Sequence, residues 1–220
     1  FYFERVQHYR GPWFLLENKV SPGPLSEYRA DYASTKRDVP PWIVGWFGVL
    51  RGRRSLDILT GLAEALPDRV QIYIRGYAGD PAIPQETLER ICATRENMIY
   101  EGPYSNPADL PTIYGRTDIA WASDFLDAGA NSTWCLTNRL YEGGVFGTPA
   151  VALDDSATGR WIREKGLGFT VKEPLEESIV AFFRELDAET YRVKQRQLES
   201  VAPSVFIDFD DTAALLAEMG

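Results

Sequence analysis

One glutamate in the middle of the chain has the type and spacing to do chemistry. Glu142 follows Asn138 by four residues, so the two share one face of the helix that is expected from residue 138. A carboxylate can accept two hydroxyl protons at once. The N-terminal end of a helix favours anions such as phosphate. A hydroxyl-binding group and an anion site are therefore expected side by side, although a solvated helix glutamate remains the alternative.

Arginines gather in a glycine-containing stretch nearer the N-terminus, Gly48-Val49-Leu50-Arg51-Gly52-Arg53-Arg54. Glycines let backbone amides approach an anion, and guanidinium groups bind phosphate oxygens bidentately. Arg51 and Arg54 fit that role best. An arginine-rich surface turn is the alternative, but the chain is otherwise acidic, with a formal net charge of −9.

The stretch from Leu136 to Ala152 must hold Glu142 in place, and it predicts a short helix followed by a buried strand. Thr137 is expected to cap the helix through its hydroxyl. Gly147 suits the left-handed position after the helix, and Pro149 prevents its continuation. Residues 150–153 are uniformly apolar, which is typical of a strand covered on both faces.

The chain from residue 41 onward alternates strand and helix patterns. Helices are expected to begin with Ser55 as a cap and with Pro84 at a first helical position. The last thirty residues predict two helices or one broken helix. Strands are expected at 42–48, 70–74, 98–100, 119–122, 150–153 and 168–171. This order predicts an α/β, Rossmann-like three-layer domain with a parallel six-stranded sheet, whose ligands bind beyond the carboxyl ends of the strands.

Composition limits the function classes. The 220 residues are 45% hydrophobic, enough for one globular core. Net negative charge disfavours nucleic acid as a partner, and no apolar run is long enough to predict a transmembrane segment. Cys92 and Cys135 suggest neither a disulfide framework nor a zinc site. His8 is the single histidine and is given no role, and no carboxylate cluster predicts a metal. A cytoplasmic setting is the default expectation.

Two segments differ in organisation. Residues 41–220 are expected to form the domain, whereas residues 1–40 are expected to be an arm and linker. For residues 1–20, a surface arm packed on the domain is an equal alternative. No signal-like segment opens the chain, so an excised domain is expected.

Asn138-Arg139-Leu140-Tyr141-Glu142, followed by Gly147-Thr148-Pro149-Ala150-Val151-Ala152, resembles the donor-binding element of retaining glycosyltransferases with the GT-B architecture, the large family 4 or group 1. The similarity covers roughly residues 41–185. Its other blocks, in order, are 43–48, 72–76, 97–102, 113–122 and 162–170. The resemblance implies one half of a GT-B fold, its C-terminal domain.

The resemblance also implies roles for individual residues. Glu142 would bind the ribose hydroxyls of a nucleotide sugar, and Arg51 and Arg54 would stabilise the leaving pyrophosphate. The remaining donor-binding positions implied are Gly48, Gly76, Gly102, Tyr104, Leu136, Thr137 and Asn138. Tyr104 could stack on the base, with an exposed loop tyrosine as the alternative.

One position departs from the family. A first glutamate is usual eight residues before the second, but Trp134 stands there. Asp127 and Asn131 are candidates to contact the donor sugar in its place, or they are turn residues. The departure leaves the identity of the sugar open and puts activity itself in question.

The implied function is donor binding for transfer of a sugar from an NDP-sugar to a saccharide or lipid-linked acceptor. No cofactor or metal is expected. The acceptor would bind through a missing N-terminal domain, which could also bring peripheral membrane contact, so the chain alone is expected to be inactive. A GT-B sugar-nucleotide epimerase and a non-catalytic α/β binding module are the alternatives.

Overall fold

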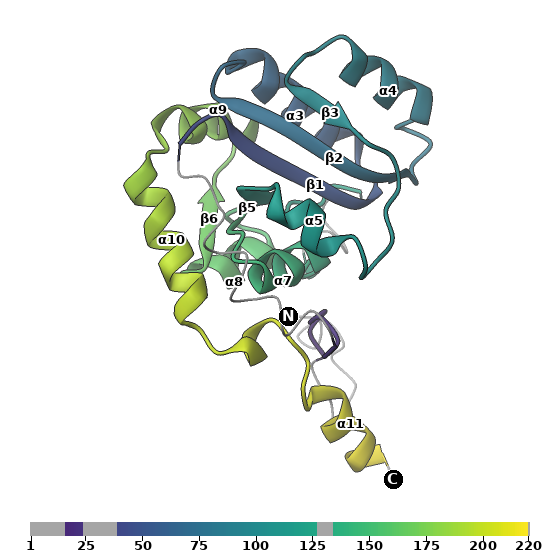
Figure 1. Ribbon diagram of the computed structural model, residues 1–220, viewed down its shortest axis with the longest axis vertical. Coiled ribbons are helices and arrows are strands. Elements are labelled where there is room, and N and C mark those ends of the chain that lie inside the picture. The colour runs from purple at the N-terminus through teal and green to yellow at the C-terminus, as the bar shows by residue number, and fades with distance from the viewer. Residues whose placement is uncertain (1–15, 24–38, 127–133, 220) are drawn as a thin grey trace.

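The computed structural model describes residues 16–23, 39–126 and 134–219 (Figure 1). The expectations for His8, Asp127 and Asn131 therefore lie outside the described residues. Six strands form one sheet in the order β3-β2-β1-β4-β5-β6, and every neighbouring pair is parallel. They are β1 (Trp42–Leu50), β2 (Val70–Ala78), β3 (Met98–Tyr100), β4 (Ile119–Trp121), β5 (Ala150–Leu153) and β6 (Gly168–Val171). The predicted fold class is confirmed.

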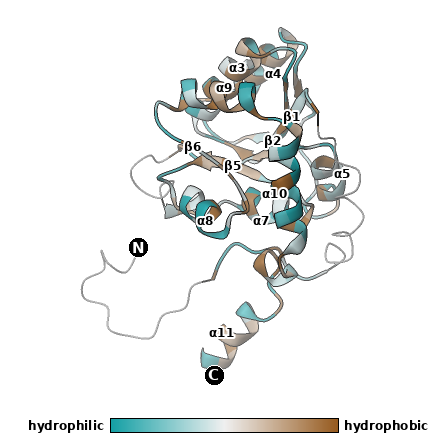
Figure 2. Cartoon of the chain, turned by 90° about the vertical axis from the view of Figure 1, so that its left-hand side faces the viewer, coloured by the Kyte–Doolittle hydropathy of each residue, from teal (hydrophilic) through white to brown (hydrophobic). Residues whose placement is uncertain are grey.

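Helices cover both faces of this sheet, giving three layers (Figure 2). One face is covered by α3 (Arg53–Ala65), α4 (Gln85–Ala93) and α9 (Leu175–Glu185). The other is covered by α5 (Leu110–Gly115), α7 (Asn138–Val145) and α8 (Ala157–Lys165). The chain then continues through α10 (Ala188–Ser200), a short 3-10 helix (Pro203–Val205) and α11 (Asp211–Met219).

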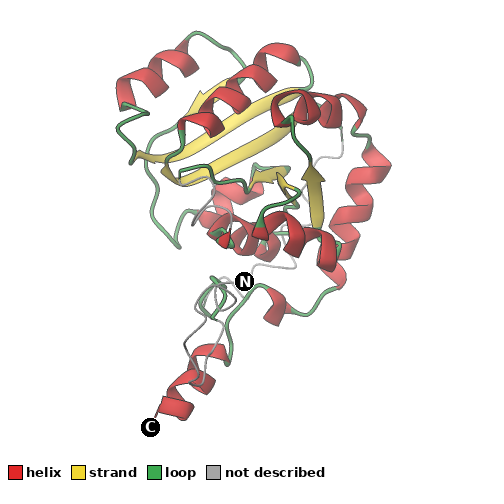
Figure 3. Ribbon diagram, turned by 180° about the vertical axis from the view of Figure 1, so that it is seen from behind, coloured by secondary structure: helices red, strands yellow, loops and turns green. Residues whose placement is uncertain are grey.

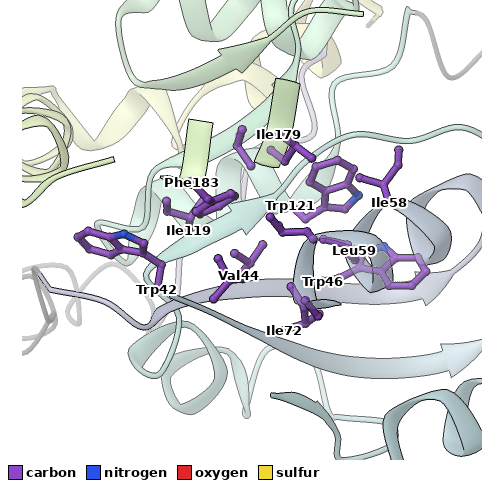
Figure 4. Packing of buried hydrophobic residues seen from close by; sticks show 14 of the residues in the cluster. Trp42, Val44, Trp46, Ile58, Leu59, Ile72, Ile119, Trp121, Ile179 and Phe183 are labelled. Atoms are coloured by element: carbon purple, nitrogen blue, oxygen red, sulfur yellow. The ribbon is translucent and has the colours of Figure 1, made fainter. Parts of the chain in front are cut away.

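Large apolar side chains fill the layer between the sheet and α3, α4 and α9 (Figure 4). Trp42 and Trp46 alternate along β1 on the same face as Val44, and Trp121 joins them from β4. Burying a side chain of this kind contributes roughly 1.5–3 kcal/mol. This packing fixes β1 against β4, where the strand order reverses and the functional site is expected.

Three expected helix starts differ from the structure. Helix α3 begins at Arg53, and Ser55 is buried, where its hydroxyl accepts a hydrogen bond from Trp121 Nε1 at 3.2 Å. Pro84 is the N-cap residue rather than the first helical residue. Thr137 holds the N-cap position but its hydroxyl donates to the Ala122 carbonyl at 3.3 Å. In all three cases, tertiary contacts or backbone geometry, rather than the local sequence preference for helix starts, decide the position or hydrogen bonding of the residue.

The segment 16–23 packs on the domain near the other end of the chain. Val20 pairs with Ile207 as an isolated parallel bridge. Asn18 Nδ2 donates to the Leu136 carbonyl at 2.8 Å, and Lys19 pairs with Asp211 at 2.6 Å. Helix α11 points away from the body of the domain (Figures 1 and 3). Within the described ranges, no helix is long and apolar enough to cross a membrane.

Candidate functional site

A cavity of about 410 Å³ opens at the carboxyl ends of the strands. Its wall combines the ends of β1 and β2, the loops that follow β3 and β4, and the first turns of α7. Seven of the residues expected from the sequence line it, namely Gly48, Arg51, Gly76, Tyr104, Thr137, Asn138 and Glu142. The structure thus brings most of the predicted site together, whereas Leu136, Gly102 and Arg54 are outside this lining.

Glu142 lies on the wall of the cavity with only 6% of its surface exposed. Its Oε2 accepts a hydrogen bond from the Tyr114 hydroxyl at 2.9 Å, and its Oε1 accepts one from Asn106 Nδ2 at 3.1 Å. Burial raises the pKa of this carboxyl, while Tyr114, Arg139 and Asn106 act in the opposite direction. The two hydrogen-bond donors to Glu142 differ in their exposure to solvent, because Tyr114 is fully buried and Asn106 is exposed.

Tyr114 was not expected from the sequence as a site residue. Its ring stacks on Phe146 at 5.6 Å between centroids and meets Phe47 edge-on at 5.1 Å. Gly143 lets α7 pack against the following loop, because a Cβ there would lie only 2.9 Å from the Thr148 carbonyl oxygen. The aromatic packing therefore holds the hydroxyl against one oxygen of Glu142.

The first turn of α7 faces the same cavity. Thr137 and Asn138 line it, and among the described residues no side-chain cap hydrogen bond is made at the helix start. The backbone N–H groups of an uncapped first turn carry partial positive charge that favours an anion. The expected cap by Thr137 is wrong, but its absence strengthens the expected anion site.

Arg139 is a second residue that sequence reasoning missed. It reaches back from α7 across the point where strand order reverses. Its Nη1 donates to the Phe47 carbonyl at the end of β1 at 2.9 Å, and its Nη2 donates to the Ser123 carbonyl after β4 at 3.1 Å. The available signal was its spacing of three from Glu142, which places both side chains on one helical stripe.

Arg51 reaches the cavity as expected, but with a partner. Its guanidinium pairs with Asp124 at 3.1 Å, and that carboxylate is 10% exposed. The Gly52 amide in the same loop donates to Asp80 Oδ2 at 2.8 Å. One of the amides expected to meet an anion is thus committed to a protein carboxylate.

Arg54 does not reach the cavity, and its expected position there is corrected. It lies on α3 and pairs with Glu173 at 2.9 Å and Glu176 at 3.1 Å, next to the start of α9. Its guanidinium also lies 4.9 Å from the centroid of the Phe125 ring. The helix begins at Arg53, so Arg54 leaves from its first turn toward α9 rather than from the glycine loop toward the strand ends.

Glycines and one tyrosine shape the far side of the cavity. A Cβ on Gly76 would lie 1.9 Å from the Gly48 carbonyl oxygen, so the two strand ends can meet only without a side chain there. Gly102 supports this side from behind, since its carbonyl accepts from Gly76 N at 2.9 Å. Tyr104 is half-buried at the cavity, and burial raises its pKa to about 12.

Among the residues that the structure describes, no group of three His, Cys, Asp or Glu side chains could hold a metal ion. Leu136 supports the site indirectly, because its carbonyl accepts from Asn18. Trp134 and Cys135 directly precede it, and Cys135 lines the cavity. The predicted sugar contacts, Asp127 and Asn131, lie in the part of the chain that is not described.

The fold is similar to that of solved glycosyltransferase domains. The C-terminal domain of the group 1 glycosyl transferase LpcC from Francisella tularensis matches 84% of this chain and 95% of its own, with a TM-score of 0.51 and 14% identity. HepE of Anabaena in complex with UDP matches 92% of this chain and 54% of its own, with a TM-score of 0.60 and 15% identity. The resemblance found in the sequence is therefore confirmed in the fold, which is that of a GT-B C-terminal domain.

A relative in sequence is similar over almost the whole chain. The succinoglycan biosynthesis protein ExoL of Rhizobium meliloti (strain 1021) is 32% identical over 222 residues, which is 99% of this chain. The chain spans 54% of the length of that relative. No family model matches the chain.

Proposed function

We propose that this chain binds the nucleotide-sugar donor of a retaining glycosyltransferase. The observation that carries the proposal is the pairing of two features in one cavity. A buried carboxylate, Glu142, is held with its oxygens on neutral donors, and the uncapped first turn of α7 lies beside it. The carboxylate suits ribose hydroxyls and the helix start suits phosphate.

Similar proteins support this choice of ligand. HepE, which shares the fold, was crystallised with UDP and with UDP-glucose. ExoL, which shares 32% of its aligned residues, is a succinoglycan biosynthesis protein. A polysaccharide or lipid-linked saccharide is accordingly the proposed acceptor. The chain spans 54% of ExoL, so acceptor binding is assigned to a further domain.

The proposed reaction needs no redox partner. The bond between the anomeric carbon and the diphosphate oxygen breaks, and its electron pair stays on the diphosphate. The acceptor oxygen bonds to the anomeric carbon on the same face, and the acceptor proton passes to the departing diphosphate. The part of this chain is to hold the diphosphate and offset its growing charge.

Ligand-observed NMR tests donor binding directly. The chain is mixed in turn with UDP-, GDP- and ADP-sugars, with Glu142→Ala as the control for site binding. Saturation transfer to one nucleotide and its sugar, lost in the variant, is the expected result. The absence of saturation transfer to the UDP-, GDP- and ADP-sugars would overturn the proposal and favour a non-catalytic α/β binding module.

We also expect the chain alone to bind donor without transferring sugar. Positioning of donor against acceptor can account for roughly 7–11 kcal/mol of a barrier, and that positioning is assigned to the further domain. The test is a radiolabelled donor assay with lipid and saccharide acceptors. Robust transfer by residues 1–220 would show that one domain suffices and that the proposed division of labour is wrong.

A further inference from the structure

Arg139 occupies a position that its local structure does not explain. It is the second residue of α7, so its positive charge stands at the end of the helix that already favours negative charge. Arg139 lines the cavity, and its guanidinium joins the Phe47 carbonyl in β1 to the Ser123 carbonyl after β4. A cation at this end of a helix is unfavourable unless a nearby anion compensates for it.

No carboxylate among the described residues contacts Arg139 directly. Arg139 forms no ion pair with a described carboxylate, because Asp124 is bonded to Arg51 and Glu142 is bonded to Tyr114 and Asn106. Both of its acceptors are neutral carbonyls, and its Nε is buried without a hydrogen-bond partner among the described residues. Burial lowers the pKa of this guanidinium, because desolvation disfavours its charged form.

Arg139 is partly buried, and taking a cation out of water without a direct counter-ion costs free energy that is recovered when an anion binds beside it. The two carbonyls fix the guanidinium plane before any ligand arrives. A guanidinium carries five N–H groups, and the hydrogen bonds to Phe47 and Ser123 use only two of its three nitrogens. The group is thus held in place with donors to spare at the cavity.

We propose that Arg139 is a catalytic residue that contacts the diphosphate of the donor, a role for which the sequence favoured Arg51 and Arg54. The proposal rests on the function proposed above and names the residue that offsets the leaving-group charge. Arg51 also lines the cavity, but Asp124 partly neutralises its charge. The competing explanation is that Arg139 only ties β1 to β4 through the two carbonyls.

Paired ligands separate these explanations. Calorimetry compares UDP with uridine, GDP with guanosine and ADP with adenosine for the parent, Arg139→Met and Arg139→Lys. Arg54→Met is the matched control, an arginine of the same edge that lies outside the cavity lining. Circular dichroism checks that each variant is folded, and Arg139→Lys serves if the methionine variant is not.

For the nucleoside diphosphate that the parent binds, we expect Arg139→Met to weaken affinity by about 10-fold to 100-fold, as for loss of a charged hydrogen bond. The nucleoside should bind within twofold of the parent. The diphosphate affinity of Arg139→Lys should lie between those of the parent and Arg139→Met, because lysine keeps the charge but cannot bond to both carbonyls. Arg54→Met should leave both ligands unchanged.

Two outcomes would overturn the inference while the proposed function stands. Equal losses for the diphosphate and its nucleoside would make Arg139 a structural tie between strands, and unchanged diphosphate binding would exclude it from the site. If the parent binds none of the three diphosphates, the proposed function fails, and this inference fails with it.

Discussion

Two arginine–glutamate clusters lie at the carboxyl edge of the sheet and are built in opposite ways. In the cavity cluster, Arg139 and Glu142 bond to neutral groups rather than to each other. In the surface cluster, Arg54 pairs directly with Glu173 and Glu176, and all three side chains are between 39% and 54% exposed. The cavity cluster keeps its two charges separate, with Glu142 buried and Arg139 partly buried, whereas the charges of the surface cluster pair with one another at the exposed surface.

The pKa directions follow this difference. Burial raises the pKa of Glu142, whereas the hydrogen bond from Arg54 lowers the pKa of Glu176. An exposed ion pair typically contributes only about 0–1 kcal/mol to folding stability. Buried charges held on neutral partners cost stability, and such groups gather at functional sites. The chemistry of this domain is therefore expected in the cavity cluster alone.

The largest effect is expected from removing the cavity carboxylate. Glu142→Ala should weaken binding of the nucleotide sugar by about 1.5–3 kcal/mol, because charged hydrogen bonds to hydroxyls are lost. Calorimetry with the donor identified by NMR measures the change. Glu176→Ala is the matched control from the surface cluster and should bind as the parent does. Equal affinities for parent and Glu142→Ala would remove Glu142 from the site.

The next effect concerns the support of that carboxylate. Tyr114→Phe keeps the ring that packs between Phe47 and Phe146 but removes the donor to Glu142 Oε2. The free energy of unfolding should fall by about 1.5 kcal/mol at neutral pH, at the low end for a bond to a charged group, since Asn106 still donates. Urea unfolding measures this.

The same variant has a signature that general loosening of the core would not produce. Without Tyr114 the pKa of Glu142 should rise further, so donor binding should weaken at a higher pH on acidification than in the parent. Arg139 from α7, Tyr104 and Asn106 also face this carboxyl and stay in place. A loss of stability with an unshifted binding profile would contradict the role assigned to Tyr114.

Much of the fold was predictable because local sequence determines it. Strands β3, β5 and β6 occupy the predicted residues, since short apolar runs there end at glycine, proline or polar residues. Strands β1 and β2 are longer than predicted, reaching Leu50 and Ala78. They pair residue for residue from Trp42–Val70 to Leu50–Ala78, and such pairing between distant segments leaves no local signal.

The candidate site was predictable where helical spacing and glycine loops define it. Glu142 and Arg51 could be placed from their own neighbourhoods. Tyr114 and Arg139 could not, because their partners lie 28 and 92 residues away. Arg54 was misplaced for the reverse reason, since its arginine-rich neighbourhood suggested phosphate while its partners come from 119 and 122 residues further on.

The stability of the protein should depend on pH in opposite directions for the glutamates of the two clusters. The folded pKa of Glu142 is raised above 4.5, so the native state binds more protons than the unfolded state, and stability falls as pH rises through that window. Glu142→Gln should therefore gain stability over the parent as pH rises above about 4.5. The folded pKa of Glu176 is lowered, so its stabilisation is present above 4.5 and is lost on acidification.

Glu176→Gln should accordingly be less stable than the parent at neutral pH, by under about 1 kcal/mol because the pair is exposed. The difference should shrink as pH falls below 4.5, the ordinary pKa of the carboxyl. Urea titrations of the three proteins from about pH 3 to about pH 8 cover both trends. Curves of the same sign for the two variants would mean that Glu142 is not held in a desolvated site.

The smallest effect is expected from Arg54→Ala, and it is the sharpest test of the comparison. The ion pairs with Glu173 and Glu176 are exposed, so the free energy of unfolding should fall by less than about 1 kcal/mol. Affinity for the nucleoside diphosphate should stay within twofold, because the guanidinium lies outside the cavity lining. Urea unfolding and calorimetry measure the two quantities. A tenfold loss of diphosphate affinity with nucleoside binding intact would mean that Arg54 leaves both glutamates when ligand binds, and the surface cluster would then belong to the site.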